Sequence, residues 1–335
     1  MKYFLLAFCS MIMLVSCNKL DQYSKTAAIK SGEINSLPSI NATKTNDIWL
    51  FVTFKPPGDK GIWLSISTDG YHWQVLNNDN PWLVPDPRVG VMRDPFIARG
   101  PAGDFHMVWT CGNRKIGYAH SNDLIHWSPQ RIIPVFTDNK NLLNVWAPEM
   151  AHDEKKDQWI IFWSSTIKGR FSETDGQVKN EKNHRIYSIK TKDFTVFSDP
   201  ELFFDPGYPV IDATLYKRHD SVTMIFKDER EFPIVKKQLK VATAPDFYGP
   251  WSVNEIPFTE PWTEGPSIMK LSDQFIVYYD TYRRPQHMSA AITKDFKTWT
   301  DVTEKLRFPP KSKHGSFLKI SQEEATALIN FTKPK

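Results

Sequence analysis

The sequence predicts an all-β fold, a five-bladed β-propeller that is closed by pairing N-terminal strands with the C-terminal blade. The first observation is a repeated turn in which an aspartate follows Ser or Thr and precedes aromatic residues. Its five copies are centred on Asp69, Asp123, Asp193, Asp246 and Asp295. The second observation is the pattern between these turns, about four short apolar runs in every ~50 residues, which is typical of propeller blades. In each turn we expect the Asp side chain to cap the backbone while the aromatic ring packs against the outer strand.

The first complete repeat begins at Asp94. It contains four apolar segments separated by turns rich in Gly or Asp, at residues 95–98, 105–110, 115–120 and 127–133, and these segments predict four strands. Three further repeats run over residues 146–204, 210–258 and 264–308. A fifth inner strand is expected at 314–320, followed by an apolar segment at 325–331.

The N-terminal part of the domain supplies the rest of the fifth blade. It has three predicted strands, at 47–54, 62–67 and 72–76, but no inner strand of its own. Joining this block to the strand at 314–320 closes the ring and removes two exposed sheet edges, which are otherwise sites of aggregation. This closure is the main reason to expect five blades rather than four.

Residues 1–17 have the features of an export signal. A short basic start is followed by an apolar run that is too short to span a membrane, and Leu14-Val-Ser-Cys17 is similar to a bacterial lipobox. The alternative is an ordinary secretory signal. We expect Cys17 to be lipidated, residues 18–46 to form a flexible tether, and residues 47–335 to form one catalytic domain. The predicted location is the outer membrane, on its periplasmic or cell-surface side, with the protein a monomer.

Composition excludes some classes of partner. The chain has 42 basic and 38 acidic residues, a formal net charge of +4, and no basic cluster, which argues against nucleic-acid binding. If Cys9 and Cys17 belong to the leader, only Cys111 remains, and no intrachain disulfide is possible in the mature domain.

Five polar residues stand at the starts of the predicted inner strands: Asp94, Glu149, Asp212, Glu264 and His314. Inner strands line the channel of a propeller, so these side chains are expected to converge. Burying carboxyl groups together is costly unless they are paired or used in chemistry, and their mutual repulsion separates their pKa values. A general acid and a general base of the kind that cleaves glycosidic bonds need such a separation. The substrate expected is therefore an oligo- or polysaccharide.

The ordered motifs around these residues resemble glycoside hydrolase family 43, over about residues 47–331, and Trp146–Glu149 and Glu264–Pro266 are the most specific of them. The resemblance implies that Asp94 is the general base, that Glu264 is the general acid, and that Asp212 orients the substrate and raises the pKa of Glu264. His314 would lie in the channel, where many members hold a water-coordinated calcium ion. The chemistry itself needs no cofactor.

Several residues are candidates for binding the substrate: Glu149, Trp146, Trp262, Arg93 and Asp228. Asp86, in a second Asp-Pro pair, is a rival to Asp94 as the base. An inverting hydrolase needs its two carboxyl groups about 6.5–9.5 Å apart, and Asp94 and Glu264 belong to non-adjacent blades, while Asp212 lies in the blade next to Glu264.

The sequence thus predicts an inverting, exo-acting glycoside hydrolase, with α-L-arabinofuranosidase as the first expectation and β-xylosidase or β-galactosidase as alternatives. A retaining enzyme of the invertase type fits less well, because no Asn-Asp-Pro motif is present. A non-catalytic glycan-binding propeller is the alternative from a different class.

Overall fold

The computed structural model describes residues 47–331. The predicted lipoprotein signal with Cys17 and the predicted tether at 18–46 therefore lie outside the described residues. Within the described part of the chain, no helix combines the length and the apolar character that crossing a membrane requires.

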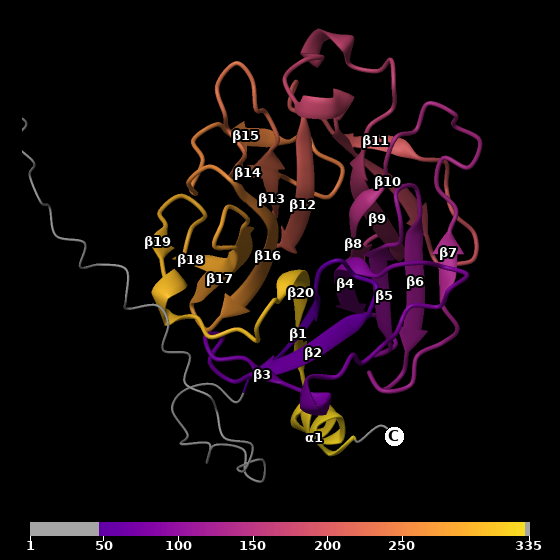
Figure 1. Cartoon of the computed structure of the whole chain (residues 1–335), viewed down its shortest axis with the longest axis vertical. Coiled ribbons are helices and arrows are strands. Elements are labelled where there is room, and N and C mark those ends of the chain that lie inside the picture. The colour runs from indigo at the N-terminus through magenta and orange to yellow at the C-terminus, as the bar shows by residue number, and fades with distance from the viewer. Residues whose placement is uncertain (1–46, 332–335) are drawn as a thin grey trace, which may run out of the picture. The chain divides into compact units, whose positions relative to one another are not determined.

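The chain forms five sheets of four strands each, which are arranged in a ring (Figure 1). Each inner strand contacts the inner strands of the two neighbouring sheets, in the cyclic order β4, β8, β12, β16, β20. The inner strands are β4 (Arg93–Arg99), β8 (Trp146–Asp153), β12 (Val210–Lys217), β16 (Thr263–Leu271) and β20 (Lys313–Ile320). The five-bladed propeller predicted from the sequence is confirmed.

The remaining strands follow outward from each inner strand as antiparallel neighbours. The second strands are β5 (Phe105–Thr110), β9 (Gln158–Ser165), β13 (Val222–Asp228), β17 (Gln274–Thr281) and β1 (Ile48–Phe54). The third strands are β6 (Ile116–Ser121), β10 (Arg185–Thr191), β14 (Gln238–Ala244), β18 (His287–Thr293) and β2 (Ile62–Ser67). The short outer strands are β7 (Arg131–Ile133), β11 (Glu201–Phe204), β15 (Ser252–Asn254), β19 (Thr300–Asp301) and β3 (Gln74–Val75).

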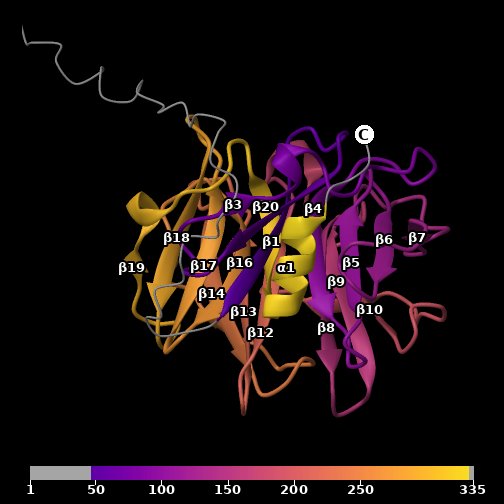
Figure 2. The same ribbon diagram turned by 90° about the horizontal axis from the view of Figure 1, so that it is seen from below.

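The closure blade, made of β20, β1, β2 and β3, joins the two ends of the domain as predicted. β1 pairs with β20 along its whole length, with Phe51 opposite Phe317, and these two rings stack with their centroids 4.6 Å apart. The apolar segment at 325–331 forms most of helix α1 (Gln322–Asn330), which begins at a capping box between Ser321 and Glu324. Figure 2 shows α1 lying against the closure blade.

The repeated Asp turns are present in the predicted form. In four of the five copies one carboxylate oxygen accepts hydrogen bonds from the backbone N–H groups two and three residues later, as Asp295 does from Lys297 and Thr298, both at 2.8 Å. These turns also explain why β7 is shorter than the predicted strand at 127–133. His126 donates its N–H to Asp123, and between an isolated bridge from Trp127 to Ser121 and the ladder that starts at Arg131 the chain is not a strand.

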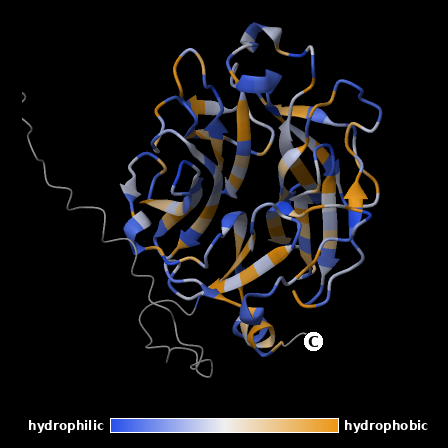
Figure 3. Cartoon of the chain, viewed as in Figure 1, coloured by the Kyte–Doolittle hydropathy of each residue, from blue (hydrophilic) through white to orange (hydrophobic). Residues whose placement is uncertain are grey.

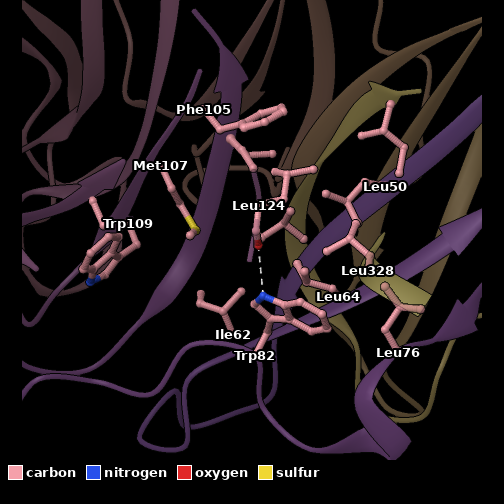
Figure 4. Packing of buried hydrophobic residues seen from close by; sticks show 14 of the residues in the cluster. Leu50, Ile62, Leu64, Leu76, Trp82, Phe105, Met107, Trp109, Leu124 and Leu328 are labelled. Carbon is pink, nitrogen blue, oxygen red and sulfur yellow. Dashed lines mark hydrogen bonds between the residues drawn. The ribbon is translucent and has the colours of Figure 1, made fainter. Parts of the chain in front are cut away.

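Apolar side chains fill the spaces between blades. Figure 3 shows the apolar residues concentrated along the strands. One cluster joins the closure blade to the β4 sheet through Leu50, Leu64, Met107 and Leu328, and in it Trp82 donates its indole N–H to the carbonyl of Leu124 at 3.0 Å (Figure 4). Burial of each large apolar side chain stabilises the fold by about 1.5–3 kcal/mol. This packing holds neighbouring blades together and so positions the strands that carry the site.

Candidate active site

Every inner strand has a bulge near its start. The register with the second strand breaks between Arg93 and Phe96, between Trp146 and Glu149, between Ile211 and Thr214, and between Glu264 and Ser267. The first residue inside each of these bulges has a positive φ: Asp94 49°, Ala147 46°, Asp212 53° and Gly265 60°. A bulge turns side chains away from the regular alternation of a strand, and here it directs them into the channel. β20 breaks its register with β1 around His314.

A pocket of about 280 Å³ lies over these bulges. Two rings of residues form most of its wall. The residues just before the bulges are Arg93, Trp146, Ile211, Glu264 and Lys313, and those inside them are Asp94, Ala147, Asp212 and His314. The structure therefore brings the three predicted catalytic carboxyl groups together, along with two of the predicted substrate-binding residues, Arg93 and Trp146.

Asp94 is paired with His314. The Nδ1 atom of His314 lies 3.4 Å from Oδ1 of Asp94. Burial opposes ionisation of Asp94, but the hydrogen bond and charge of His314, with help from Arg93 and Thr110, outweigh it and lower the pKa of this carboxyl. Burial likewise disfavours a charged imidazole, yet the hydrogen bond to Asp94 and the surrounding carboxylates raise the pKa of His314 to about 10. Asp94 is thus ionised, as a general base must be.

Asp212 lies beside the strand that carries Glu264. Its Oδ2 atom accepts a hydrogen bond from the Gly265 N–H at 3.0 Å, and its own N–H donates to Ser164 Oγ at 3.1 Å. Burial, reinforced by the negative charge of Glu264 against the opposing charge of His314, raises the pKa of Asp212 to about 6. Asp212 is therefore next to the acid, as predicted, and is itself the carboxyl group of the predicted triad whose pKa is raised.

Glu264 is held between two lysines. Its Oε2 atom accepts a hydrogen bond from Lys227 and its Oε1 atom accepts one from Lys313, each at 3.1 Å. Burial alone raises the pKa of a carboxyl group, but the two ammonium groups outweigh it and lower the pKa of Glu264 to about 2. The prediction that Asp212 keeps Glu264 protonated is therefore wrong for the free pocket, because the charges of Lys227 and Lys313 dominate the pKa of Glu264.

Glu149 does not occupy the same position on its strand as Asp94 and Asp212 occupy on theirs. It pairs with Phe162 after the bulge, so it lies deeper than Ala147, which occupies the position that corresponds to Asp94. Glu149 is buried and does not line the pocket, and burial raises its pKa to about 8. Its assignment as a substrate-binding residue is therefore not supported by the pocket wall, where Ala147 takes the place on this strand.

Two other predicted substrate contacts are also absent from the pocket wall. Asp228 is fully buried and forms ion pairs with Arg230 at 2.6 Å and Lys240 at 2.9 Å. Trp262 packs edge-on against Tyr282 and has the Arg283 guanidinium 4.0 Å from its ring centroid. Asp86, the rival base, lies outside the pocket and pairs with Arg88.

The water-coordinated calcium ion expected beside His314 stays a prediction. Direct binding by the ring does not fit, because calcium prefers oxygen ligands and the Nδ1 atom of His314 is paired with Asp94. Among residues 47–331, no group of three or more His, Cys, Asp or Glu side chains is arranged to hold a metal ion. No step below depends on a metal.

Sequence reasoning missed Lys227, Lys313 and Asp280. Asp280 lies opposite Glu264 in the β16–β17 register, and burial with the charge of Glu264 raises its pKa to about 7. Lys313 directly precedes His314, and Lys227 ends a buried apolar run on β13. The available signal was Lys227 at the end of an apolar run that is predicted to be a buried strand. Lysine is rarely buried without a charged partner, so its position indicates a carboxylate nearby.

Comparisons with known proteins identify the family of the chain. A family model for family 43-related proteins, described as a probable glycosyl hydrolase domain, matches residues 47–326. An α-L-arabinofuranosidase of Bifidobacterium longum is 26% identical over 319 residues, which cover 77% of this chain and 29% of that protein. The chain thus spans less than a third of the length of that relative.

Solved structures show the same fold. The α-L-arabinofuranosidase of Lactobacillus brevis has a TM-score of 0.50 at 17% identity, covering 65% of this chain and 74% of that one. The xylan β-1,4-xylosidase of Bacillus halodurans has a TM-score of 0.53 at 16% identity, covering 72% and 49% respectively.

Proposed function

Because the chain belongs to the family 43-related glycosyl hydrolases, we propose that it is an inverting, exo-acting glycoside hydrolase, with terminal α-L-arabinofuranose as the first substrate to test. One observation carries the proposal. Asp94 and Glu264 line the same pocket from β4 and β16, which are separated in the ring by β20. Lys313 of β20 pairs with Glu264 while His314 pairs with Asp94, so the two carboxyl groups lie on opposite sides of one strand.

In the proposed reaction Asp94 takes a proton from a water molecule, and the water oxygen attacks the anomeric carbon. The bond from that carbon to the leaving oxygen breaks as Glu264 donates a proton to the oxygen, which inverts the configuration. Asp212, fixed by the Gly265 N–H, orients the sugar. Glu264 must first take up its proton, and displacement of the partly exposed Lys313 by the sugar would favour this uptake because one positive charge leaves.

The size of the pocket supports exo-action. A volume of about 280 Å³ lies at the low end for small-molecule sites, which span about 300–1,000 Å³, and it suits one terminal sugar. Trp146 is the aromatic side chain on the pocket wall and offers a face for stacking against the ring. Its assignment as a substrate contact is part of the proposal, and so is that of Arg93.

The test is a screen of aryl glycosides. We expect release of the aryl group from the α-L-arabinofuranoside, with the β-D-xyloside and β-D-galactoside as the next substrates, and loss of release in Glu264→Gln. Glu255→Gln is the matched control, because Glu255 is also held by a lysine, Lys240 at 2.6 Å, but lies outside the pocket. Unchanged activity in Glu264→Gln would remove Glu264 from the mechanism.

A glycan-binding protein without activity is the second candidate, and the ionised Glu264 favours it, because an acid that stays ionised cannot donate a proton. Binding of an arabinose-containing glycan with no release of reducing sugar would support this second candidate.

We also propose that the protein is exported and anchored through a lipid on Cys17, on the sequence evidence of residues 14–17. Cell fractionation tests this proposal. The wild-type protein is expected with the membranes and Cys17→Ser in the soluble fraction, and equal distribution would contradict it.

A further inference from the structure

Lys227 carries a deeply buried ammonium group shared by two carboxylates. Its side chain is 2% exposed, and its Nζ atom lies 2.7 Å from Oε2 of Glu229 and 3.1 Å from Oε2 of Glu264. The same atom lies 4.6 Å from the centroid of the Tyr282 ring. Burying a lysine is costly unless its charge is compensated. The buried charge of Lys227 thus lies next to Glu264, the carboxyl group that has to donate the proton.

The two lysines on Glu264 differ in access. Lys313 lines the pocket and is 16% exposed, so a bound sugar can reach it and move it. Lys227 does not line the pocket, so a sugar that fills the pocket lies against Lys313 and not against Lys227. Glu229 is in turn shared with Lys237, whose Nζ lies 2.6 Å from its Oε1. The charge that Lys227 presents to Glu264 is thus moderated by Glu229.

We propose that Lys227 is a positioning residue for the reaction: its ammonium group fixes the Glu264 carboxyl group and, balanced by Glu229, sets how readily Glu264 takes up the proton that it donates. This inference rests on the proposed function and names the residue that controls the acid. The other charged or titratable groups around Glu264 and Lys227 come from several elements. They are His184 before β10, Asp212 on β12, Asp280 on β17, Tyr282 after β17, and Lys313 and His314 on β20.

Two substitutions change the balance in opposite directions. Lys227→Met removes a positive charge from Glu264 and leaves Glu229 paired with Lys237, so Glu264 binds its proton more tightly. Glu229→Gln removes the negative charge that moderates Lys227, so Glu264 binds its proton less tightly. Lys240→Met is the matched control, because Lys240 is also buried between two carboxylates, at 2.9 and 2.6 Å, but lies outside the pocket.

The experiment is the pH profile of kcat on the aryl glycoside that the wild type cleaves, with folding of each variant checked by circular dichroism. The alkaline limb of this profile reports the acid in the enzyme–substrate complex, where Glu264 holds the proton that it donates. An opposite charge at this distance moves a carboxyl pKa by about one to three pH units. We expect the limb to move to higher pH by about that amount in Lys227→Met, to move to lower pH in Glu229→Gln, and to stay in place in Lys240→Met. If the limb is the same in Glu229→Gln as in the wild type, the proposal is overturned, even when Lys227→Met does not fold.

An inactive wild type would refute the proposed function but not the role of Lys227 toward Glu264. The ionisation of Glu264 is then followed by NMR of protein with 13C-labelled Glu carboxyl groups, with its signal identified by its absence in Glu264→Gln. The same opposite changes in the titration of that signal are expected, and identical titrations in the wild type and Glu229→Gln would overturn the proposal.

Discussion

Gly265→Ala tests whether the bulge on β16 fixes His314 and, through it, the base. Gly265 has a φ of 60°. An added Cβ would lie 2.6 Å from Cγ, 2.9 Å from Cδ2 and 3.0 Å from Nδ1 of His314. The His314 ring is buried and its Nδ1 atom lies 3.4 Å from Asp94, while the backbone N–H of His314 donates to Asp280 at 3.1 Å. A ring that moves away from the added Cβ therefore disturbs its contact with Asp94.

The magnitude follows from two costs. A left-handed backbone costs an alanine about 1–2 kcal/mol, and overpacking costs about 1–3 kcal/mol, which together lower the free energy of unfolding by about 2–5 kcal/mol. Gly103→Ala is the control, because Gly103 also has a positive φ, 88°, but has nothing within 4 Å of its added Cβ. It bears only the backbone cost, and the entropy that either substitution removes from the unfolded chain is the same for both.

Urea unfolding of both variants gives the stabilities, and hydrolysis of the aryl glycoside gives the activities. We expect Gly265→Ala to be the less stable of the two by at least about 1 kcal/mol and to lose about 10²-fold in kcat/KM, because a shifted His314 misplaces Asp94. Gly103→Ala should keep the wild-type rate. Equal stabilities and equal rates would refute the view that the bulge fixes the His314–Asp94 pair.

Four further predictions follow from the same site. Asp94→Asn is expected to lose about 10²–10⁴-fold in kcat while Asp86→Asn keeps the wild-type kcat, and the opposite result would make Asp86 the base. Asp228→Asn should leave KM unchanged and lower the free energy of unfolding by about 3 kcal/mol, because the buried Lys240 and the partly exposed Arg230 lose a charged partner; a raised KM in a stable variant would support it as a substrate contact. Burial raises the pKa of Glu149 from 4.5 to about 8, so its contribution to stability is fully present below pH 4.5 and is lost as the pH rises through 8. The melting temperature should thus fall more between pH 5 and pH 8 in the wild type than in Glu149→Gln, and parallel curves would contradict this sign. Because the proposed chemistry uses no metal, removing divalent cations with a chelator should leave the rate unchanged, and a fall in rate or melting temperature that calcium alone restores would support the water-coordinated calcium expected beside His314.

The architecture was open to prediction because its signals are local and repeated. An Asp turn such as that at Asp295 is formed by residues that are neighbours in the sequence. The spacing between successive turns therefore gives the number of blades. The pairing of β1 with β20 followed from the missing inner strand at the N-terminus. Helix α1 was not predicted as a helix, since its apolar segment is short and its capping box lies before that segment.

The site was predicted less completely, because it depends on the register within each blade. The bulges displace the strand starts by one or two positions, so that Glu149 lies below the pocket and Ala147 takes the position that corresponds to Asp94. A sequence motif does not reveal which face a residue takes after a bulge. The lysines on Glu264 come from other strands, and their contacts exist only when the ring closes.

The central claim is that Asp94 and Glu264 perform an inverting hydrolysis, and the first sugar product tests it most directly. Proton NMR, recorded during cleavage of an aryl α-L-arabinofuranoside and before mutarotation, identifies the anomer that the enzyme releases. The proposed mechanism predicts that the β-anomer appears first and that Glu264→Gln produces none. The α-anomer as first product would contradict the mechanism, since retention requires a carboxylate nucleophile in place of a water molecule activated by Asp94.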